Sequence, residues 1–345
     1  MPRVSGSGPL DAGALLAPLL EFERVALAVS GGPDSLALLL LAHQFATAHG
    51  SHRRFVVYSV DHGLRPEAAA EVAFVTGEAR RLGFEARGLA WQGAKPATGI
   101  QQAARAARYR LFAAAMRADG ATALVTAHHR HDQAETVLMR LAHGSGIEGL
   151  RGMDVFSQVD GITIVRPLLR VDPAALRAVV EAAGLTPVTD PSNSDLDYER
   201  VRWRQMLAPL AALGLDAGRL ELFAARMRDA DRALERMVAE VLGRIAIQPD
   251  ALQATLDRDL LVGLPRAVAV RVLSRVLERI GGRRKPHALA AVETLTDRLR
   301  RERVVKRSTL HGCIVRSDGD VIGIEKEPGR AAAAARRRSH EALHP

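Results

Sequence analysis

The chain has 345 residues, of which 48% are hydrophobic and 25% are charged, and this length is typical of two globular domains. Its single cysteine, Cys313, excludes internal disulfides, multi-cysteine metal sites and sulfur transfer by paired cysteines. The formal net charge of +9 favours a polyanionic partner. No run of residues is apolar enough to span a membrane, and residues 1–20 contain Gly and Asp where a signal peptide needs an unbroken apolar core, so we expect a cytoplasmic protein.

Strand and helix signals alternate over the first two hundred residues. Apolar, β-branched runs predict strands at 25–29, 55–60, 84–91, 123–126 and 162–169. Helices are predicted at 11–22, from 35 onward, at 100–117, at 131–143, and from Pro173 with Asp172 as its cap. This alternation predicts an α/β fold with a doubly wound, mostly parallel sheet. Ligands of such sheets bind at the carboxyl ends of the strands, so the segments 30–35, 61–65 and 127–133 should share one edge.

The pattern changes to helices from about residue 201. The predicted helices are 220–245, 266–280 and 288–301. Alternating apolar positions over 304–324, with an Asp-Gly pair at Asp318 and Gly319, predict a small antiparallel hairpin. We therefore expect a catalytic domain at 1–205, a helical and α+β C-terminal region at 206–328, and a disordered tail at 329–345.

The C-terminal region also carries an excess of positive charge. Between residues 283 and 307, nine Lys or Arg stand against three Asp or Glu. A solvated basic face and contact with an RNA backbone both account for this excess.

The segment 30–35, Ser-Gly-Gly-Pro-Asp-Ser, connects the first predicted strand to a helix. Its glycines allow successive N–H groups to point inward, and the helix N-terminus adds its dipole, so the loop predicts a phosphate site. The residues of this site are Ser30, Gly31, Gly32, Pro33, Asp34 and Ser35. The loop lacks the Gly-Lys-Ser/Thr ending of the nucleotide loop whose lysine reaches the β and γ phosphates. It resembles instead the loop of the PP-loop ATP pyrophosphatases, which implies that it holds the pyrophosphate released from ATP.

A second block, Ala-His-His-Arg-His-Asp-Gln-Ala-Glu-Thr at 127–136, lies where a strand enters a helix. Asp132 and Asp34 offer two carboxylates for a Mg²⁺ ion shared with ATP phosphates, although Asp132 as an isolated residue is better explained as a helix cap. His128 and His129 are adjacent, which is rare for ligands of one ion, and no cysteine accompanies them. A zinc site is therefore the weaker interpretation.

Two loops and one helix have patterns that suit phosphate or RNA. The glycine-rich segment 144–153 allows close backbone approach, although a surface turn is its default interpretation. Its first residues are Gly144, Ser145 and Gly146. The segment 189–204 suits a rigid loop that ends in Arg200 and Arg204, four residues apart.

The helix at 100–117 places Gln101, Arg105, Arg108 and Phe112 on one face. Arginines at such positions face either solvent or a phosphate, and the pattern leaves both open.

Taken together and in this order, these blocks resemble the tRNA(Ile)-lysidine synthetase family. The resemblance covers roughly residues 20–204, and its marks are SGGPDS, DHGLR at 61–65, HHxxDQxET, GSGxxGLxGM and DxSN. A weaker likeness continues at 309–313 and 325–328. This chain departs from the family at Ala127, His131, His143, Thr189 and Val201. His131 matters most, because the family usually has Asp there and a carboxylate near the site is lost.

The resemblance implies an enzyme that joins free L-lysine to C2 of the wobble cytidine in the CAU anticodon of isoleucine tRNA. The cytidine O2 attacks the α-phosphate of ATP, pyrophosphate leaves, and the lysine ε-amine then displaces AMP. The implied catalytic residues are Asp34 and Asp132, which position Mg²⁺, Arg108, which contacts phosphate, and Glu135, which binds the lysine ammonium or accepts its proton. An exposed helix carboxylate without such a role is the alternative for Glu135.

The remaining residues are assigned by the same resemblance. The additional nucleotide or substrate pocket comprises Asp61, His62, Arg65, Arg105, His128, His129, Gly144, Ser145 and Gly146. The tRNA-binding residues are Arg200, Arg204, Arg283, Arg284 and Lys285. The sequence is also compatible with a homodimer.

Two other functions compete with this interpretation. Another PP-loop enzyme, of the amide or NAD synthetase type, would adenylate a small carboxylate, but the later blocks and the basic C-terminal region disfavour it. A non-catalytic tRNA-binding protein would have lost the loop glycines or the carboxylates, and this chain keeps them.

Overall fold

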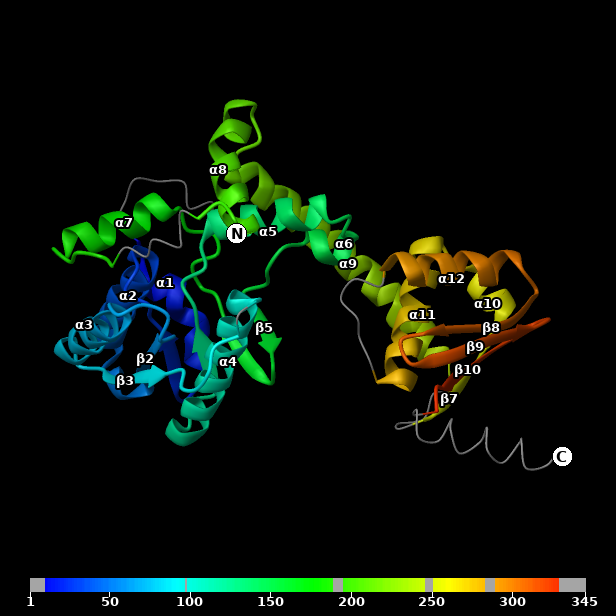
Figure 1. The fold of residues 1–345 in the computed structure, drawn as a ribbon. Coiled ribbons are helices and arrows are strands. Elements are labelled where there is room, and N and C mark those ends of the chain that lie inside the picture. Colours follow the sequence, from blue (N-terminus) through cyan, green and yellow to red (C-terminus); the bar gives the residue numbers. More distant parts are fainter. Residues whose placement is uncertain (1–9, 97, 189–194, 246–250, 283–288, 329–345) are drawn as a thin grey trace. The chain divides into compact units, whose positions relative to one another are not determined.

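The computed structural model describes residues 10–96, 98–188, 195–245, 251–282 and 289–328. The chain forms two compact units, whose elements are labelled in Figure 1. The first comprises Met1–Gly144 and Gly149–Arg226, and the second comprises Ser145–Glu148 and Met227–Pro345. Within the described residues no helix combines the length and the apolar character that crossing a bilayer requires.

Some predictions fall outside the described residues. They are the tRNA-binding residues Arg283, Arg284 and Lys285, the first part of the 189–204 loop, and the disordered tail at 329–345.

Six strands form the sheet of the first unit, in the order β3-β2-β1-β4-β6-β5. They are β1 (Val25–Ala28), β2 (Phe55–Asp61), β3 (Glu85–Ala90), β4 (Ala123–Val125), β5 (Phe156–Val159) and β6 (Ile162–Val165). All pairs are parallel except the antiparallel pair of β5 with β6. The predicted α/β fold with a mostly parallel sheet is therefore confirmed.

The hairpin of β5 and β6 was not predicted. Asp160 and Gly161 connect its strands, and both have positive φ angles, of 50° and 78°. Such angles are typical of Asp-Gly pairs in two-residue hairpins. Strand β5 is half exposed, so it lacks the apolar run by which the other strands were recognised.

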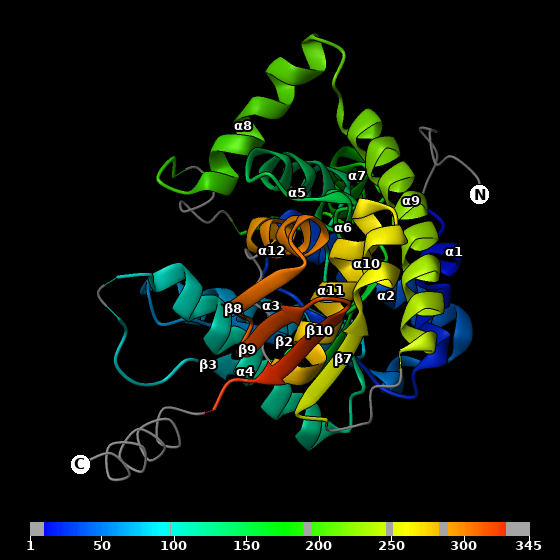
Figure 2. The ribbon, with the colours of Figure 1, turned by 90° about the vertical axis from the view of Figure 1, so that its right-hand side faces the viewer.

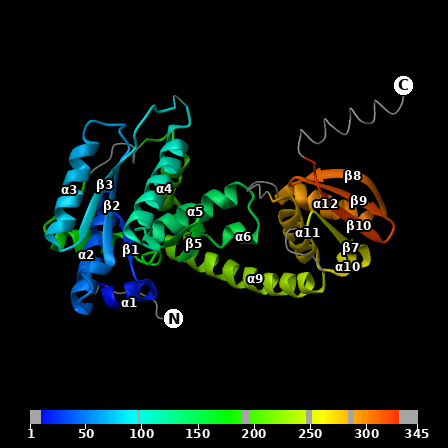
Figure 3. The same ribbon diagram turned by 90° about the horizontal axis from the view of Figure 1, so that it is seen from below.

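Helices cover both faces of this sheet, as Figure 3 shows for α2, α3 and α4. One face carries α1 (Ala12–Leu16), η1 (Ala17–Glu21), α2 (Pro33–His49), α3 (Ala68–Arg81) and α7 (Pro173–Ala182), with the short η2 (His52–Arg54) before β2. The other face carries α4 (Ile100–Asp119). The unbroken apolar run of α2 fits its position, because residues 35–42 are all buried. Asp172 caps α7 through a 2.8 Å hydrogen bond from the N–H of Ala174, as predicted.

The strand order reverses at β1, which lies between β2 and β4. In doubly wound sheets the crevice at such a reversal binds ligands outside the carboxyl ends of the strands. The segments that follow β1 and β4, residues 30–35 and 127–133, are therefore neighbours at this edge.

Three helices extend the first unit beyond the sheet. They are α5 (Arg130–Ala142), α8 (Glu199–Ala212) and the beginning of α9 (Ala217–Arg244), and α6 (Ile147–Leu150) follows α5. Apolar side chains of α5, α8 and α9 share one small core, which includes Val137, Leu207 and Ala224. The predicted domain boundary after residue 205 falls inside α8, whereas this core carries the first unit on to Arg226.

The second unit packs helices on a four-stranded antiparallel sheet with the order β7-β10-β9-β8, which Figure 2 shows. Its elements are α10 (Arg258–Gly263), α11 (Arg266–Gly281), α12 (Leu289–Arg301), β7 (Gln253–Asp257), β8 (Val304–Leu310), β9 (Cys313–Asp318) and β10 (Val321–Lys326). A two-residue turn at Gly319 and Asp320 joins β9 to β10, one position after the predicted pair of Asp318 and Gly319. A second turn at His311 and Gly312, both with positive φ, joins β8 to β9 and was not predicted.

Candidate active site

The loop at 30–35 closes on itself before α2 begins. Gly31 has a φ angle of +90°, which side-chain-bearing residues rarely adopt, and a Cβ built there would lie 3.0 Å from Val188 Cγ2. Gly32 is the N-cap of α2 and Pro33 its first residue. The Ser35 hydroxyl donates to the Gly32 carbonyl at 2.9 Å, and it accepts from the Ser30 N–H at 3.2 Å. The loop therefore presents the N-terminus of a 17-residue helix at the ligand edge of the sheet.

His129 links the two carboxylates that were predicted to share an ion. Its Nε2 lies 3.4 Å from Asp34 Oδ2, and its Nδ1 lies 3.4 Å from Asp132 Oδ2. The backbone N–H of His129 donates to Asp132 Oδ2 at 2.9 Å, and the N–H of Asp132 donates to His129 Nδ1 at 3.4 Å. These reciprocal bonds form a capping box at the start of α5, so Asp132 also has the structural role that its position suggested.

Neighbouring charges together affect the pKa of His129 more than its burial does. Burial alone would lower the pKa of His129, but the hydrogen bond to Asp34 and the negative charge of Asp132 raise it above its ordinary value. Burial would likewise raise the pKa of Asp132, but His129 and Arg200 lower it below its usual range. These interactions therefore favour the protonated form of His129 and the ionised form of Asp132.

The pKa of His128 shifts in the opposite direction to that of His129, because burial lowers it to about 4. Its Nδ1 lies 2.8 Å from the Thr126 hydroxyl. Neutral His128 therefore adds a hydrogen-bonding group to the site and no charge.

Glu135 is the centre of an ion-pair network between α5 and α8. Its side chain is 0% exposed, and its Oε2 and Oε1 accept hydrogen bonds from Arg200 Nε at 2.6 Å and from Arg204 Nε at 2.7 Å. Arg200 also donates to Asp132 Oδ1 at 2.7 Å. The alternative that Glu135 is an exposed helix carboxylate is wrong, because α8 covers it. The two arginines predicted to bind tRNA are each paired with carboxylates, while their side chains remain 40% and 44% exposed.

Burial divides the predicted arginine face of α4. Phe112 is buried in the core, whereas Gln101 is exposed. Arg105 lies over the ring of Tyr109, with its guanidinium carbon 5.0 Å from the ring centroid. Arg108 is half-buried, and burial lowers its pKa. Among the described residues no hydrogen bond or ion pair holds the Arg108 guanidinium, so it is available to a ligand.

The residues of the DHGLR block lie at the carboxyl end of β2, beside β1. Asp61 accepts a 2.6 Å hydrogen bond from the N–H of Gly63, and Arg65 donates to both oxygens of Glu71 at 3.0 Å. Asp61 and Arg65 thus fix the turn that leads into α3. Their predicted contact with nucleotide remains a prediction, as does that of His62.

The glycine-rich loop is clamped to α5 by two side chains. Gln133 accepts from the N–H of Met153 at 2.7 Å and donates to its carbonyl at 2.9 Å. Arg140 Nη1 donates to the carbonyls of Gly149 and Gly152 at 2.8 and 2.7 Å. A Cβ at Gly152, whose φ is +73°, would lie 2.7 Å from the Gln133 amide. Of the predicted pocket residues, Gly144 belongs to the first unit, whereas Ser145 and Gly146 group with the second.

Sequence reasoning missed Arg166, which follows β6 and is only 6% exposed. It was counted as an interior residue of a predicted strand. The available signal was a charged residue inside an apolar run at the carboxyl end of that strand, next to a proline.

The predicted Mg²⁺ site fits Asp34 better than Asp132. Within the described residues no group of three or more His, Cys, Asp or Glu side chains is arranged to hold a metal ion. Mg²⁺ commonly takes only one or two protein carboxylates and completes its shell with water and phosphate. Asp34 is 34% exposed beside the phosphate loop, and of its oxygens only Oδ2 contacts a described residue, His129. Both oxygens of Asp132 are already held, by His129 and Arg200.

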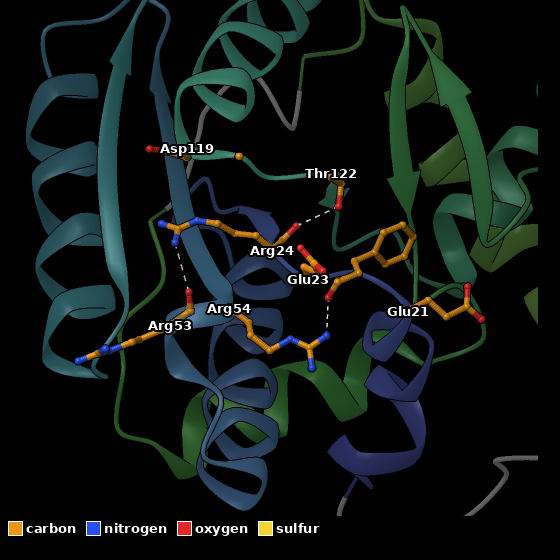
Figure 4. A pocket seen from close by; sticks show the side chains of 9 residues that line it. Glu21, Glu23, Arg24, Arg53, Arg54, Asp119 and Thr122 are labelled. Atoms are coloured by element: carbon orange, nitrogen blue, oxygen red, sulfur yellow. Dashed lines mark hydrogen bonds between the residues drawn. The ribbon is translucent and has the colours of Figure 1, made fainter.

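A hollow of about 540 Å³ lies at the opposite edge of the sheet, before β1, β2 and β4 begin. Figure 4 shows Arg24, Arg53 and Arg54 among the side chains that line it. Arg24 donates to the carbonyl of Arg53, and Arg54 donates to the carbonyl of Phe22. Arg24 and Arg54 therefore hold loop carbonyls, and Arg24 also pairs with Glu85 at 2.7 Å. The hollow therefore contributes nothing to the site around His129.

One protein family and several individual proteins resemble this chain in sequence. A model of the PP-loop domain family matches residues 11–211. The tRNA(Ile)-lysidine synthase of Bradyrhizobium sp. strain BTAi1 is 40% identical over 339 residues, which cover 93% of this chain and 94% of that protein. That of Rhodopseudomonas palustris is 41% identical over 330 residues, which cover 93% and 95%.

A solved structure resembles the fold. The U34-tRNA thiolase NcsA from Methanococcus maripaludis has a TM-score of 0.50 and 14% identity, and the similarity covers 59% of this chain and 72% of that chain. At this identity the likeness concerns the fold alone.

Proposed function

This chain belongs to the tRNA(Ile)-lysidine synthase family of PP-loop proteins, and we propose that its site makes lysidine by adenylating a tRNA base with ATP and then adding lysine. The relatives' name gives an isoleucine tRNA as the substrate and a lysidine as the product. The chain is accordingly a carbon–nitrogen ligase that uses ATP.

The chemistry needs a leaving group on the base. Cytidine O2 attacks the α-phosphorus of ATP, the bond to the β-phosphate breaks, and pyrophosphate leaves. The lysine ε-amine then forms a bond to C2, the C2–O2 bond breaks, and AMP departs with O2. The base is a poor electrophile until O2 is phosphorylated, so the first step sets up the second.

The observation that carries the proposal is the joining of the 30–35 loop to the start of α5 through His129. Asp34 belongs to the phosphate loop and Asp132 to the capping box of α5, and His129 lies 3.4 Å from a carboxylate oxygen of each. Backbone N–H groups at the start of α2 suit the departing pyrophosphate. Mg²⁺ bound through Asp34, with Asp132 nearby, would neutralise charge on the phosphates. His129, which lies between Asp34 and Asp132, holds the two carboxylates close together beside the loop.

Glu135 contributes to the second step, in which lysine attacks the adenylated base. Its buried negative charge suits the ammonium of free lysine, which must lose a proton before it attacks. Both of its oxygens are held by Arg200 and Arg204, so lysine reaches Glu135 only when one of these arginines moves. The guanidinium groups of Arg200 and Arg204 are partly exposed and suit the phosphates of the tRNA. These phosphates can replace the carboxylates as partners of the two arginines.

The second unit carries exposed basic residues that suit contact with the tRNA backbone. Lys306 and Arg307 on the edge strand β8 are exposed, as is Arg301 at the end of α12. An edge strand with lysine also resists pairing with other chains, which is the plainer explanation of Lys306. The phosphate contacts predict that tRNA affinity falls steeply as salt rises.

The deciding experiment is mass spectrometry of nucleosides after the purified protein acts on Mg-ATP, lysine and unmodified CAU isoleucine tRNA. We expect a nucleoside with the mass of cytidine plus lysine minus water. Release of pyrophosphate without that nucleoside would leave adenylation in place and overturn lysine as the nucleophile. Pyrophosphate release with a small carboxylic acid in place of tRNA would favour an amide-forming PP-loop enzyme. Neither activity from a folded protein that binds tRNA would overturn the catalytic proposal.

A further inference from the structure

Arg166 is a buried cation that forms no ion pair with a carboxylate of the described residues. Its Nη1 donates to the Asp154 carbonyl at 3.0 Å and to the Ser157 hydroxyl at 2.8 Å. Its Nε is buried and makes no hydrogen bond to the described residues. A buried charge is costly unless it is paired with an opposite charge. The described residues offer this guanidinium hydrogen bonds but no ion pair.

The position of Arg166 places it beside the candidate active site. It follows β6 directly, and the N–H of Thr126, at the end of the neighbouring β4, donates to the Val165 carbonyl at 3.0 Å. Ile162 and Ile164, at the alternate positions of β6, pack into the core that α4 covers. Arg166 therefore faces α4, on the far side of β4 from the phosphate loop.

Two arginines of α4 share this region. Arg105 lies close enough to both Arg108 and Arg166 to lower the pKa of each, although burial is the larger cause for both. Arg166 and Arg105 also help to hold down the pKa of His128, after burial. Asp154 is the acidic neighbour of Arg166, and its carboxylate also lies 3.2 Å from Arg151. Positive charge is therefore in excess where the carboxyl ends of β4 and β6 meet α4.

We propose that Arg166 joins Arg105 and Arg108, to which the family resemblance already gives contact with the nucleotide, in a second anion subsite that is separate from the 30–35 loop and binds a phosphate group of a substrate. This inference rests on the proposed function and deepens it, because both of its substrates carry phosphate. The group is either the α-phosphate of ATP or a phosphodiester beside the wobble cytidine. Arginine forks bind two phosphate oxygens at once, and an entering anion supplies the charge that Arg166 lacks.

The test is the variant Arg166→Gln, which removes the charge and keeps a hydrogen-bonding amide. Calorimetry measures its affinity for Mg-ATP, and filter binding measures its affinity for an RNA hairpin of the CAU anticodon arm. If the subsite holds the ATP phosphate, we expect Mg-ATP to bind about tenfold more weakly and the hairpin to bind as in wild type. If it holds the RNA, the hairpin weakens by about as much, and its salt slope falls by about one.

Two further variants complete the design. Arg108→Gln removes a guanidinium that makes no hydrogen bond within the described residues. Its affinities for Mg-ATP and the hairpin test the subsite if Arg166→Gln does not fold. Arg110→Gln is the matched control, since Arg110 is exposed on the same helix. Folded Arg108→Gln and Arg166→Gln proteins that bind both ligands as wild type does would overturn the subsite. These assays measure binding alone, so a failure to form lysidine would be seen separately.

Discussion

Arg200 Nε donates a 2.6 Å hydrogen bond to Glu135 Oε2, although the two residues are 65 positions apart and lie on different helices. The bond fastens α8 to α5, whose first turn contains the catalytic candidate Asp132. Arg204 repeats it one turn later, on the other oxygen of Glu135. One buried carboxylate therefore joins α8 to α5 at two points, in addition to the apolar core that the helices share.

Glu135→Gln should loosen this junction. The amide keeps the shape of the side chain but leaves two guanidinium groups facing a neutral partner. Because the arginines are partly exposed, we expect a loss of about 1–3 kcal/mol in unfolding free energy, below the value for a fully buried pair. Urea denaturation measures it. Glu199→Gln, which removes the half-exposed partner of His143, is the control and should cost less than half as much. Equal losses in the two variants would contradict a special role for Glu135.

Gly31→Ala should weaken ATP binding more than it weakens the fold. The left-handed φ costs a side-chain-bearing residue about 1–2 kcal/mol, and the new Cβ would also press on Val188. Gly50→Ala is a matched control, because Gly50 has a φ of +59° at the other end of α2 and open space around it. Both variants should lose thermal stability, but only Gly31→Ala should show a raised KM for ATP. A raised KM in Gly50→Ala would show that α2 acts as a whole.

The sequence predicted the parts of this site that local patterns encode. The apolar run of β1 and α2 with glycines between them predicts the phosphate loop, and the Asp172-Pro173 pair predicts the start of α7. The Glu135 network could not be predicted, because it depends on how α8 packs against α5. Arg166 was missed for a related reason, since its burial follows from the pairing of β6 with β4 and from the cover of α4.

Short edge strands escaped prediction for a different reason. In β7 the burial alternates between exposed and buried residues over five positions, and β5 is half exposed throughout. Such strands bury too few side chains to give a continuous apolar run. The turn beside β5 is more informative, since Asp160 and Gly161 adopt the positive φ angles of a tight hairpin.

Acid should destabilise the first unit through His128. Its pKa is lowered to about 4 by burial, below the ordinary value near 6.5. The unfolded chain therefore binds a proton that the folded chain refuses, and stability that is present above pH 6.5 is lost as the pH falls toward 4. His128→Asn should lose less unfolding free energy than wild type between pH 7 and pH 5, by about 2 kcal/mol. Parallel losses in both proteins, measured by denaturant titration without added metal, would contradict this assignment.

Gln133→Ala should release the glycine-rich loop from α5. The variant removes both hydrogen bonds to Met153, while the Arg140 bonds to Gly149 and Gly152 remain, so the loop should loosen without unfolding. Hydrogen exchange of the Met153 amide should become faster by about tenfold, which corresponds to one hydrogen bond of about 1.4 kcal/mol. Gln158→Ala, which removes a 2.8 Å hydrogen bond to the Thr163 hydroxyl in the β5–β6 hairpin, is the control. If the loop positions a substrate, kcat should fall in Gln133→Ala alone. A faster exchange with unchanged kinetics would instead show that Gln133 serves only the fold.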